Sequence, residues 1–239
     1  MPRPAGRLVF LAAIAFATAG AAASVQQTHD LYGNTFRQSL WIEARGVPGA
    51  APASVDAALA QALAAVQEVE SATDRAQGPL AALDAAAGGA PQKVPAALLQ
   101  PLVRALSFCR WSEGTHGPLG ASLWDAWGLR APRPGLPVPD DIERAAGAAR
   151  CDNLTLDEAK GTAQLAAGAQ VDLWAFAPGA AVDRAIERLR AAGVRDASVT
   201  LGGIQRAIGS AADGAGWPLR VTLPPELAEM TSKLELLNL

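Results

Sequence analysis

The spacing of apolar residues along the chain predicts a mixture of strands and helices. Between residues 36 and 44, Leu40, Ile42 and Ala44 occupy alternate positions, as in a half-buried strand. After a turn rich in Gly and Pro, apolar residues recur every three or four positions, which predicts a helix from an N-cap at Ser54 to about residue 71. The buried face of that helix is predicted to hold Val55, Leu59, Leu63, Val66 and Val69.

Three further helices are predicted by the same criteria. Residues 85–93 form a loop by their Gly and Pro content, and a helix then begins near Pro95, with Pro101 in its first turns. A short helix starts near residue 139, and another covers residues 181–192 and ends at Gly193. The helix that begins near Pro95 is predicted to bury Leu98, Leu102, Leu106 and Cys109.

The other apolar stretches are typical of strands. Residues 154–172 predict a hairpin whose second strand ends near Asp172, and residues 197–201 predict a strand that leads into Gly202 and Gly203. A last strand is predicted over residues 217–223. Hairpins combined with segregated helices favour an α+β fold over a doubly wound parallel sheet. The sequence contains no internal repeat.

The first residues have the layout of a secretory signal peptide. Arg3 and Arg7 precede an apolar run over residues 8–17, and small residues follow up to Ala23, after which cleavage is predicted. The alternative is a buried N-terminal helix or membrane anchor, but the run is shorter than the roughly 20 apolar residues of a bilayer span. Ser24 stands where a lipoprotein would carry Cys. We therefore expect a periplasmic protein of residues 24–239, soluble and without membrane insertion.

Composition excludes some partners and leaves the cysteines undecided. The net charge of the 239 residues is −3 and the basic residues form no block, so neither nucleic acid nor an anionic membrane is expected as a partner. Cys109 and Cys151 either pair in an oxidising compartment or stay free as small buried side chains. His29 and His116 are the only histidines, and neither a cysteine pair with metal-ligand spacing nor a GxxxxGK loop occurs.

Three segments place Gly, Asp and aromatic residues in predicted loops, where binding residues concentrate: 113–129, 171–183 and 199–209. In order and spacing they resemble three blocks of the ApbE-type FAD:protein FMN transferases, namely a GAFDPTVGPLxxLWGF-like segment, a DLGAIAKGYAVD-like segment, and a strand ending in Gly-Gly with a further Gly beyond. Residues 32–36 (YGNTF) resemble the MGT start of the family, PDDIERA precedes the hairpin, and GWPLRVTLP resembles its GxPWRVxIxxP strand. The resemblance covers the mature chain to Pro224.

The resemblance implies a flavin transferase fold and an activity. Such an enzyme binds FAD as its substrate and uses a divalent metal, usually Mg²⁺, at the pyrophosphate. It moves FMN to a Thr hydroxyl of a flavoprotein acceptor that faces the periplasm, such as a subunit of an ion-pumping quinone reductase, and releases AMP. The metal would neutralise charge on the splitting diphosphate while a nearby group deprotonates the hydroxyl.

The site residues implied by the resemblance include several departures from the family pattern. The Ala-Phe-Asp of the family falls on residues 115–117, so Gly117 replaces a carboxylate. Ala175 falls on a metal-holding position and offers only its carbonyl, and Pro178 replaces the Lys or Glu beside the flavin. No catalytic residue is assigned. The predicted cofactor-binding positions are Tyr32, Thr115, His116, Gly117, Asp172, Pro178, Gly202 and Gly203, and the predicted metal position is Ala175.

Each of these positions also has an ordinary structural interpretation. Asp172 is typical of a carboxylate that caps nearby amides, the Gly202–Gly203 pair of a turn, and His116 of a loop histidine. We expect Trp124 and Trp127 to serve in packing rather than flavin stacking.

Active relatives continue into His-Ile-x-Asp-Pro and Asp-Ala-x-x-Thr motifs that complete the metal site, and this chain contains neither. Three hypotheses follow: an FMN transferase with a reduced site, a non-catalytic flavin- or protein-binding relative, and a fragment whose remainder is encoded separately. We expect weak or absent FMN transfer by this chain alone, unless Asp125 or Asp183 substitutes for the missing carboxylates.

Overall fold

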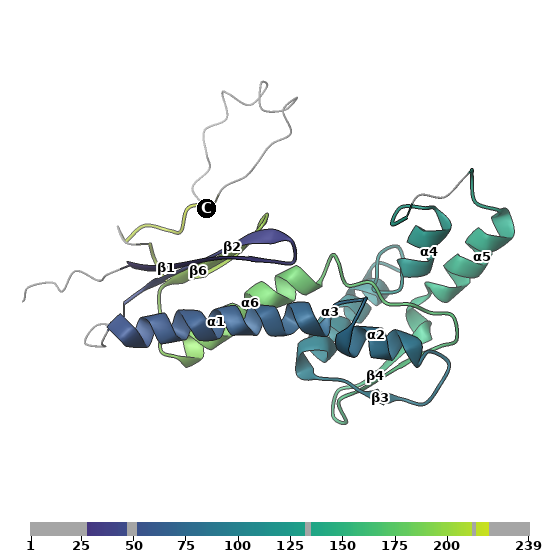
Figure 1. The fold of residues 1–239 in the computed structure, drawn as a ribbon, viewed down its shortest axis with the longest axis horizontal. Helices are drawn as coiled ribbons and strands as arrows, with labels where there is room; N and C mark the ends of the chain where they lie inside the picture. The colour runs from purple at the N-terminus through teal and green to yellow at the C-terminus, as the bar shows by residue number, and fades with distance from the viewer. Residues whose placement is uncertain (1–27, 47–51, 132–134, 212–213, 220–239) are drawn as a thin grey trace, which may run out of the picture.

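The computed structural model describes residues 28–46, 52–131, 135–211 and 214–219 (Figure 1). Among these, one antiparallel sheet has the strand order β1-β2-β6-β7 and a second has the order β3-β5-β4. Both sheets are antiparallel and combined with helices, which confirms the α+β prediction. The predicted signal peptide and most of the predicted strand 217–223 lie outside the described residues, and residues 217–219 form no regular strand.

The four-stranded sheet joins two hairpins from opposite parts of the chain. Its strands are β1 (Thr28–Thr35), β2 (Gln38–Arg45), β6 (Ala197–Leu201) and β7 (Ile204–Ile208). The alternating residues Leu40, Ile42 and Ala44 are buried as predicted. The strand predicted over residues 36–44 is confirmed as β2, which begins two residues later because Phe36 and Arg37 form a turn between β1 and β2 with φ of 53° and 58°.

A carboxylate from a helix stabilises this unusual turn. Glu70 accepts hydrogen bonds from the buried Thr35 hydroxyl and from the main-chain amide of Phe36. Positive φ is rare for residues other than Gly, Asn and Asp, so a hairpin of this kind carries no Gly or Asn signal that a sequence pattern could detect.

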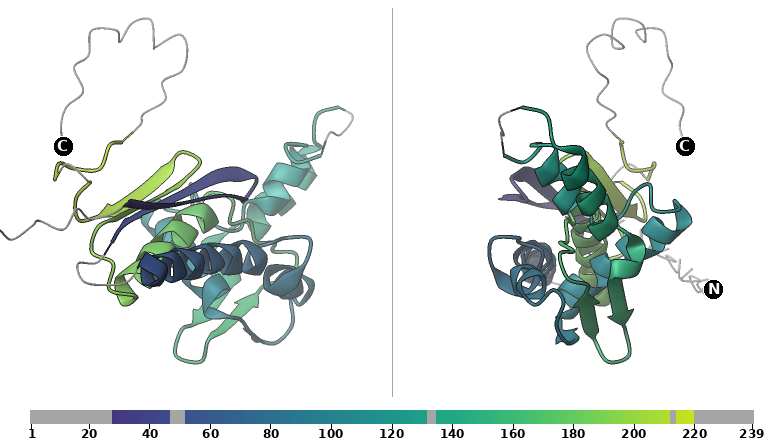
Figure 2. Two further views of the ribbon diagram at one scale, coloured as in Figure 1. Left: turned by 60° about the vertical axis from the view of Figure 1, so that its left-hand side comes forward. Right: turned by 90° about the vertical axis from the view of Figure 1, so that its right-hand side faces the viewer.

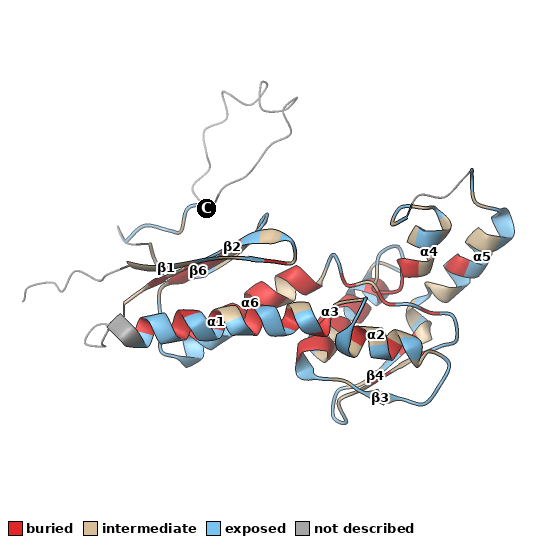
Figure 3. Cartoon of the chain, in the orientation of Figure 1, coloured by how far each residue is buried: buried red, intermediate tan, exposed pale blue. Residues whose placement is uncertain are grey.

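Two antiparallel helices cover the inner face of this sheet, α1 (Pro52–Ala72) and α6 (Ala177–Ala191). Along α1 buried and exposed residues alternate, as expected of an amphipathic helix (Figure 3). Both helices begin earlier than predicted: Ser54 lies inside α1 instead of capping it, and α6 starts four residues before position 181. Pro178 explains the early start of α6, since proline is favoured in a first turn, where its missing N–H leaves no bond unmade.

The second part of the molecule is built around α3 (Ala96–Trp111), which begins next to Pro95 as predicted and contains Pro101. Its strands are β3 (Gln92–Lys93), β4 (Leu154–Asp157) and β5 (Thr162–Leu165), so the predicted hairpin ends at Leu165 and not near Asp172. The predicted loop over residues 85–93 contains β3, and the preceding α2 (Gly78–Ala85) was not predicted.

Two short helices lie farthest from the four-stranded sheet along the long axis in Figure 1, and Figure 2 gives two further views of them. They are α4 (Ala121–Ala126) and α5 (Pro139–Ala148), the latter as predicted. A 3-10 turn, η1 (Cys151–Asn153), leads from α5 into β4. No helix within the described ranges is long and apolar enough to cross a bilayer.

Cys109 and Cys151 form a disulfide, with their Cα atoms 6.0 Å apart. The bridge joins the last turn of α3 to η1, and therefore fixes the entry to β4 against the helix. This decides between the two alternatives that the sequence leaves open for the cysteines.

Candidate functional site

Two of the three segments singled out in the sequence meet beside the first turn of α6. The main-chain amide of Asp172 donates a hydrogen bond of 2.7 Å to the carbonyl of Pro118. Next to this contact the His116 ring lies 5.5 Å from the ring of Phe176, measured between centroids. Residues 115–118 and 172–176 therefore form one continuous surface region.

The rings at this junction form an aromatic cluster of Phe108, Trp111, His116 and Phe176. Phe108 lies 5.1 Å from Trp111, 5.6 Å from His116 and 6.0 Å from Phe176, between ring centroids. Trp111 is 76% exposed and Phe108 is 40% exposed. Large aromatic rings are usually buried, so the exposed rings of Phe108, Trp111 and His116, beside the half-buried Phe176, offer faces and edges to a planar or apolar ligand.

The loop that carries His116 is held by Ser112 and by the disulfide. The Ser112 hydroxyl donates to the His116 carbonyl at 3.0 Å and accepts from the His116 amide at 3.2 Å. Gly117 packs against the bridge, because a Cβ atom at this position would lie 2.5 Å from Cys109 Sγ and 2.7 Å from Cys109 Cβ. No side chain fits at position 117 without moving α3, so the missing carboxylate of the family pattern has no room here.

Asp172 is enclosed by two arginines. One of its carboxylate oxygens lies 3.7 Å from Arg75 Nη1 and 3.7 Å from Arg130 Nη1, and its side chain is 8% exposed. The other oxygen accepts a 2.9 Å hydrogen bond from the main-chain amide of Trp174. The capping interpretation of Asp172 thus describes its contacts, with two ion pairs in addition.

A second buried carboxylate completes this cluster of charges. Asp84 accepts a 2.9 Å hydrogen bond from the Val171 amide, and one of its oxygens lies 4.0 Å from Arg75 Nη2. Burial raises the pKa of Asp84, an effect that the Val171 hydrogen bond and Arg75 oppose and that the nearby charge of Asp172 reinforces. Asp125 in turn binds Arg130 through both carboxylate oxygens. The ionic contacts hold residues 171–174 in place.

The residues present do not fit a divalent metal site. Ala175 is exposed and contributes at most a carbonyl, while Asp125 and Asp172 are paired with arginines. Asp183 is paired with both Arg104 and Arg206. Within the described part of the chain no three His, Cys, Asp or Glu side chains lie together, whereas Mg²⁺ takes about six oxygen ligands.

The other predicted site residues lie outside this junction or are buried. Tyr32 is 71% exposed on β1 and stacks on Trp41 at 5.7 Å between ring centroids. Pro178 is buried in the first turn of α6, and Thr115 is exposed in the loop.

Gly202, with φ of 56°, forms the β6–β7 turn with Gly203, and its amide donates to Ser39 at 2.9 Å. None of the contacts found between described residues joins Tyr32 or this turn to residues 115–118, so the structure brings together only two of the predicted segments.

Several residues at the junction are not predicted from the sequence. Arg75, Asp84 and Arg130 come from separate segments: Arg75 pairs with both Asp84 and Asp172, and Arg130 pairs with Asp172. Phe108 belongs to α3, whose apolar residues are expected to face the core, and Phe176 lies in the predicted loop 171–183, just before α6. The one available signal was that Asp172 follows a buried segment and would need a positive partner there.

The chain is similar to known proteins over most of its length. The ApbE family matches residues 32–238. This chain belongs to the ApbE family. Two curated FAD:protein FMN transferases are similar to it. The protein of Treponema pallidum (strain Nichols) is 35% identical over 167 residues, which are 66% of this chain and 46% of the relative. The protein of Rhodobacter capsulatus is 34% identical over 154 residues, 62% of this chain and 28% of the relative.

Solved ApbE structures share the fold. The flavin transferase ApbE from Vibrio cholerae gives a TM-score of 0.67 at 22% identity, over 80% of this chain and 62% of that one. The apo form of the Pseudomonas stutzeri flavinyl transferase ApbE gives a TM-score of 0.70 at 21% identity, with the same coverage. The chain spans less than half of the two curated relatives and about three fifths of these structures.

Proposed function

We propose that this chain is an FAD:protein FMN transferase with a reduced site, which moves FMN from FAD to a Thr hydroxyl of a flavoprotein acceptor facing the periplasm. The observation that carries the proposal is the junction between residues 115–118 and 172–176, since these segments hold two of the three blocks that resemble the family. The names of the curated relatives support the same activity.

In the proposed reaction a P–O bond of the FAD diphosphate breaks, the Thr oxygen bonds to the phosphorus of FMN, and AMP leaves, with the Thr hydroxyl proton passing to the phosphate of AMP. The aromatic cluster would bind a planar ring of FAD, and the Arg75–Asp172–Arg130 contacts would keep the neighbouring segment rigid. Asp125, Asp172 and Asp183 are all engaged by arginines, so none is free to take the proton of the Thr hydroxyl.

We therefore expect slow transfer. Loss of a single well-placed stabilising group at an active site commonly lowers kcat by about 10²–10³. Because Gly117 and Pro178 provide neither charge nor a side-chain donor, a rate at least about a hundredfold below that of a full-length relative is expected.

The test is to incubate the protein with FAD, an acceptor domain containing the target Thr, and either Mg²⁺ or EDTA, and to follow covalent flavin on the acceptor by in-gel fluorescence. An acceptor with that Thr replaced by Val is the control. FAD affinity is measured separately by quenching of flavin fluorescence, with Phe176→Ala against Trp127→Ala, an exposed aromatic outside the cluster. We expect FAD binding that Phe176→Ala weakens, and slow labelling that requires the Thr.

A non-catalytic flavin-binding relative is the second candidate. It is favoured by the packing of Gly117 against Cys109, which leaves no room for the family carboxylate. FAD binding without any labelling would support this candidate. Labelling as fast as that of a full-length relative would contradict the reduced site, and absence of both binding and labelling would contradict both functions.

We also propose export to the periplasm with a mature N-terminus at Ser24, on the basis of the basic and apolar leader. The disulfide supports this, because such bridges persist mainly in oxidising compartments. N-terminal sequencing of the protein from a periplasmic fraction is expected to begin at Ser24. An intact Met1 in the cytosolic fraction would contradict export.

A further inference from the structure

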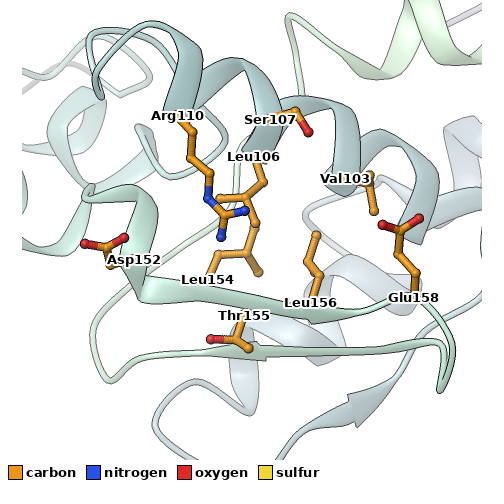
Figure 4. Close-up of a pocket in the computed structure, with 9 residues that line it drawn as sticks. All are labelled: Val103, Leu106, Ser107, Arg110, Asp152, Leu154, Thr155, Leu156 and Glu158. Carbon is orange, nitrogen blue, oxygen red and sulfur yellow. The ribbon is translucent and has the colours of Figure 1, made fainter.

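A groove of about 340 Å³ lies between α3 and β4. Figure 4 shows its two walls, with Val103, Leu106 and Arg110 from the helix facing Leu154 and Leu156 from the strand. Asp152 lies at one end. Glu158 lies at the other. Charged side chains thus flank the groove at both ends, and the half-buried Val103 and Leu156 lie between them.

One wall of the groove is the free edge of a sheet. β4 pairs only with β5 among the described strands, since the sheet has the order β3-β5-β4. The Ala166 amide donates to the Asn153 carbonyl at 2.9 Å, opposite in the β4–β5 register. Because bonded residues alternate along an antiparallel strand, Leu154 and Leu156 turn their main-chain groups to the free edge.

Three main-chain groups are therefore available at this edge. The Leu154 amide already donates to the Cys151 carbonyl. The groups left to pair with an added strand are the Leu154 carbonyl and the amide and carbonyl of Leu156. None of the three takes part in a turn, loop or side-chain hydrogen bond found between described residues. An exposed strand edge with unpaired donors and acceptors is a template for an added strand.

Two unpaired charges give the groove a direction, since Asp152, which lies at the same end as Arg110, is paired with Arg150 at 3.7 Å. In the part of the chain that the structure describes, neither the Arg110 guanidinium nor the Glu158 carboxylate has an ion-pair or hydrogen-bond partner. Arg110 lies beside the start of β4 and Glu158 follows its end. An antiparallel strand would bring its N-terminal end to Glu158 and its C-terminal end to Arg110.

We propose that this groove binds an extended segment of a partner protein as an additional strand antiparallel to β4. The segment has a basic residue at its N-terminal end, a carboxylate at its C-terminal end, and apolar side chains between them. The half-buried side chains of Val103 and Leu156 contact the apolar side chains of the segment. The unpaired groups of β4 supply affinity, while Arg110 and Glu158 supply orientation. Binding here needs no flavin.

The test uses the oxidised, full-length protein and two acetylated, amidated peptides, KTVTVTE and its charge-exchanged counterpart ETVTVTK. Titration is followed by two-dimensional NMR of ¹⁵N-labelled protein. We expect shifts confined to α3, η1 and β4, slower hydrogen exchange at the Leu156 amide, and about tenfold tighter binding of KTVTVTE, as expected when two favourable end contacts become like-charge contacts.

Charge reversal in the protein provides the matched test. Arg110→Glu is expected to weaken KTVTVTE binding, and the double variant Arg110→Glu with Glu158→Lys is expected to prefer ETVTVTK instead. Arg188→Glu makes the same charge change on an exposed position of α6 and should leave the preference unchanged. The reversed preference in the double variant also shows that the protein remains folded.

Three outcomes would overturn the proposal. They are no saturable binding at about 1 mM peptide, equal binding of both peptides, and shifts that lie away from β4. Binding without protection of the Leu156 amide would likewise overturn strand addition, because it would indicate an apolar or small-molecule site.

Discussion

Replacing Gly117 with Ala adds a single methyl group at a position that the disulfide already fills. The new Cβ would lie 2.5 Å from Cys109 Sγ and 2.7 Å from Cys109 Cβ, closer than unbonded atoms approach. The backbone at Gly117 does not have positive φ, so the whole effect is steric. Overpacking of this kind costs about 1–3 kcal/mol, and because Cys109 belongs to both α3 and the bridge we expect the upper half of that range.

The control is Gly147→Ala in α5, where an added Cβ meets no atom within 4 Å. There alanine is expected to stabilise the protein by about 0.5–1 kcal/mol through helix propensity. Urea unfolding of both variants, followed by circular dichroism under oxidising conditions, gives the two free energies of unfolding. If Gly117→Ala were as stable as the wild type, the packing of position 117 against the bridge would be refuted, and with it our reason for the missing carboxylate.

Three further predictions concern the contacts that fix the fold. Replacing Cys109 and Cys151 with Ser, which opens a link across 42 positions, should lower the free energy of unfolding by about 4 kcal/mol in chemical denaturation. Glu70→Gln should lower the free energy of unfolding by about 1–3 kcal/mol, because two donors of the β1–β2 turn lose a charged acceptor. The control Glu68→Gln breaks an ion pair with Arg184 and should lower it by less than about 1 kcal/mol in the same measurement. Burial raises the pKa of Asp84 above 3.8, so the folded state favours the neutral form of this carboxyl group. As pH rises from about 4 through the raised pKa, the free energy of unfolding of the wild type, measured in urea, should fall relative to that of Asp84→Asn. The same pH dependence in both proteins would contradict this.

The local pattern of apolar and polar residues predicts much of the fold. It fails where residues far apart in the sequence determine the conformation. The alternation of Leu40, Ile42 and Ala44 correctly identifies the buried face of β2. It gives no sign of the turn at Phe36, which depends on a glutamate 34 positions away. The short α2 is likewise missed, since eight residues hold too few apolar positions for a period to be recognised.

The candidate site is predicted less completely than the fold. The order of the three segments correctly indicates the family, and the structure joins two of these segments through Asp172 and Pro118. Which side chains are available for chemistry depends on charge partners that no spacing rule reveals. Arg75 and Arg130 approach Asp172 from different segments, and Cys109 occupies the space that a side chain at position 117 would need.

The strand order β1-β2-β6-β7 has a consequence for the rate at which the chain folds. Leu40 pairs with Leu201, so the two hairpins join only across nearly the whole intervening sequence. Chains with contacts of such long range fold slowly, because the chain loses conformational entropy on closing the loop before the strand pairing stabilises the sheet. Until β6 pairs with β2, one edge of β2 exposes unpaired main-chain donors and acceptors. Chaperones that bind unfolded chains would bind at this edge.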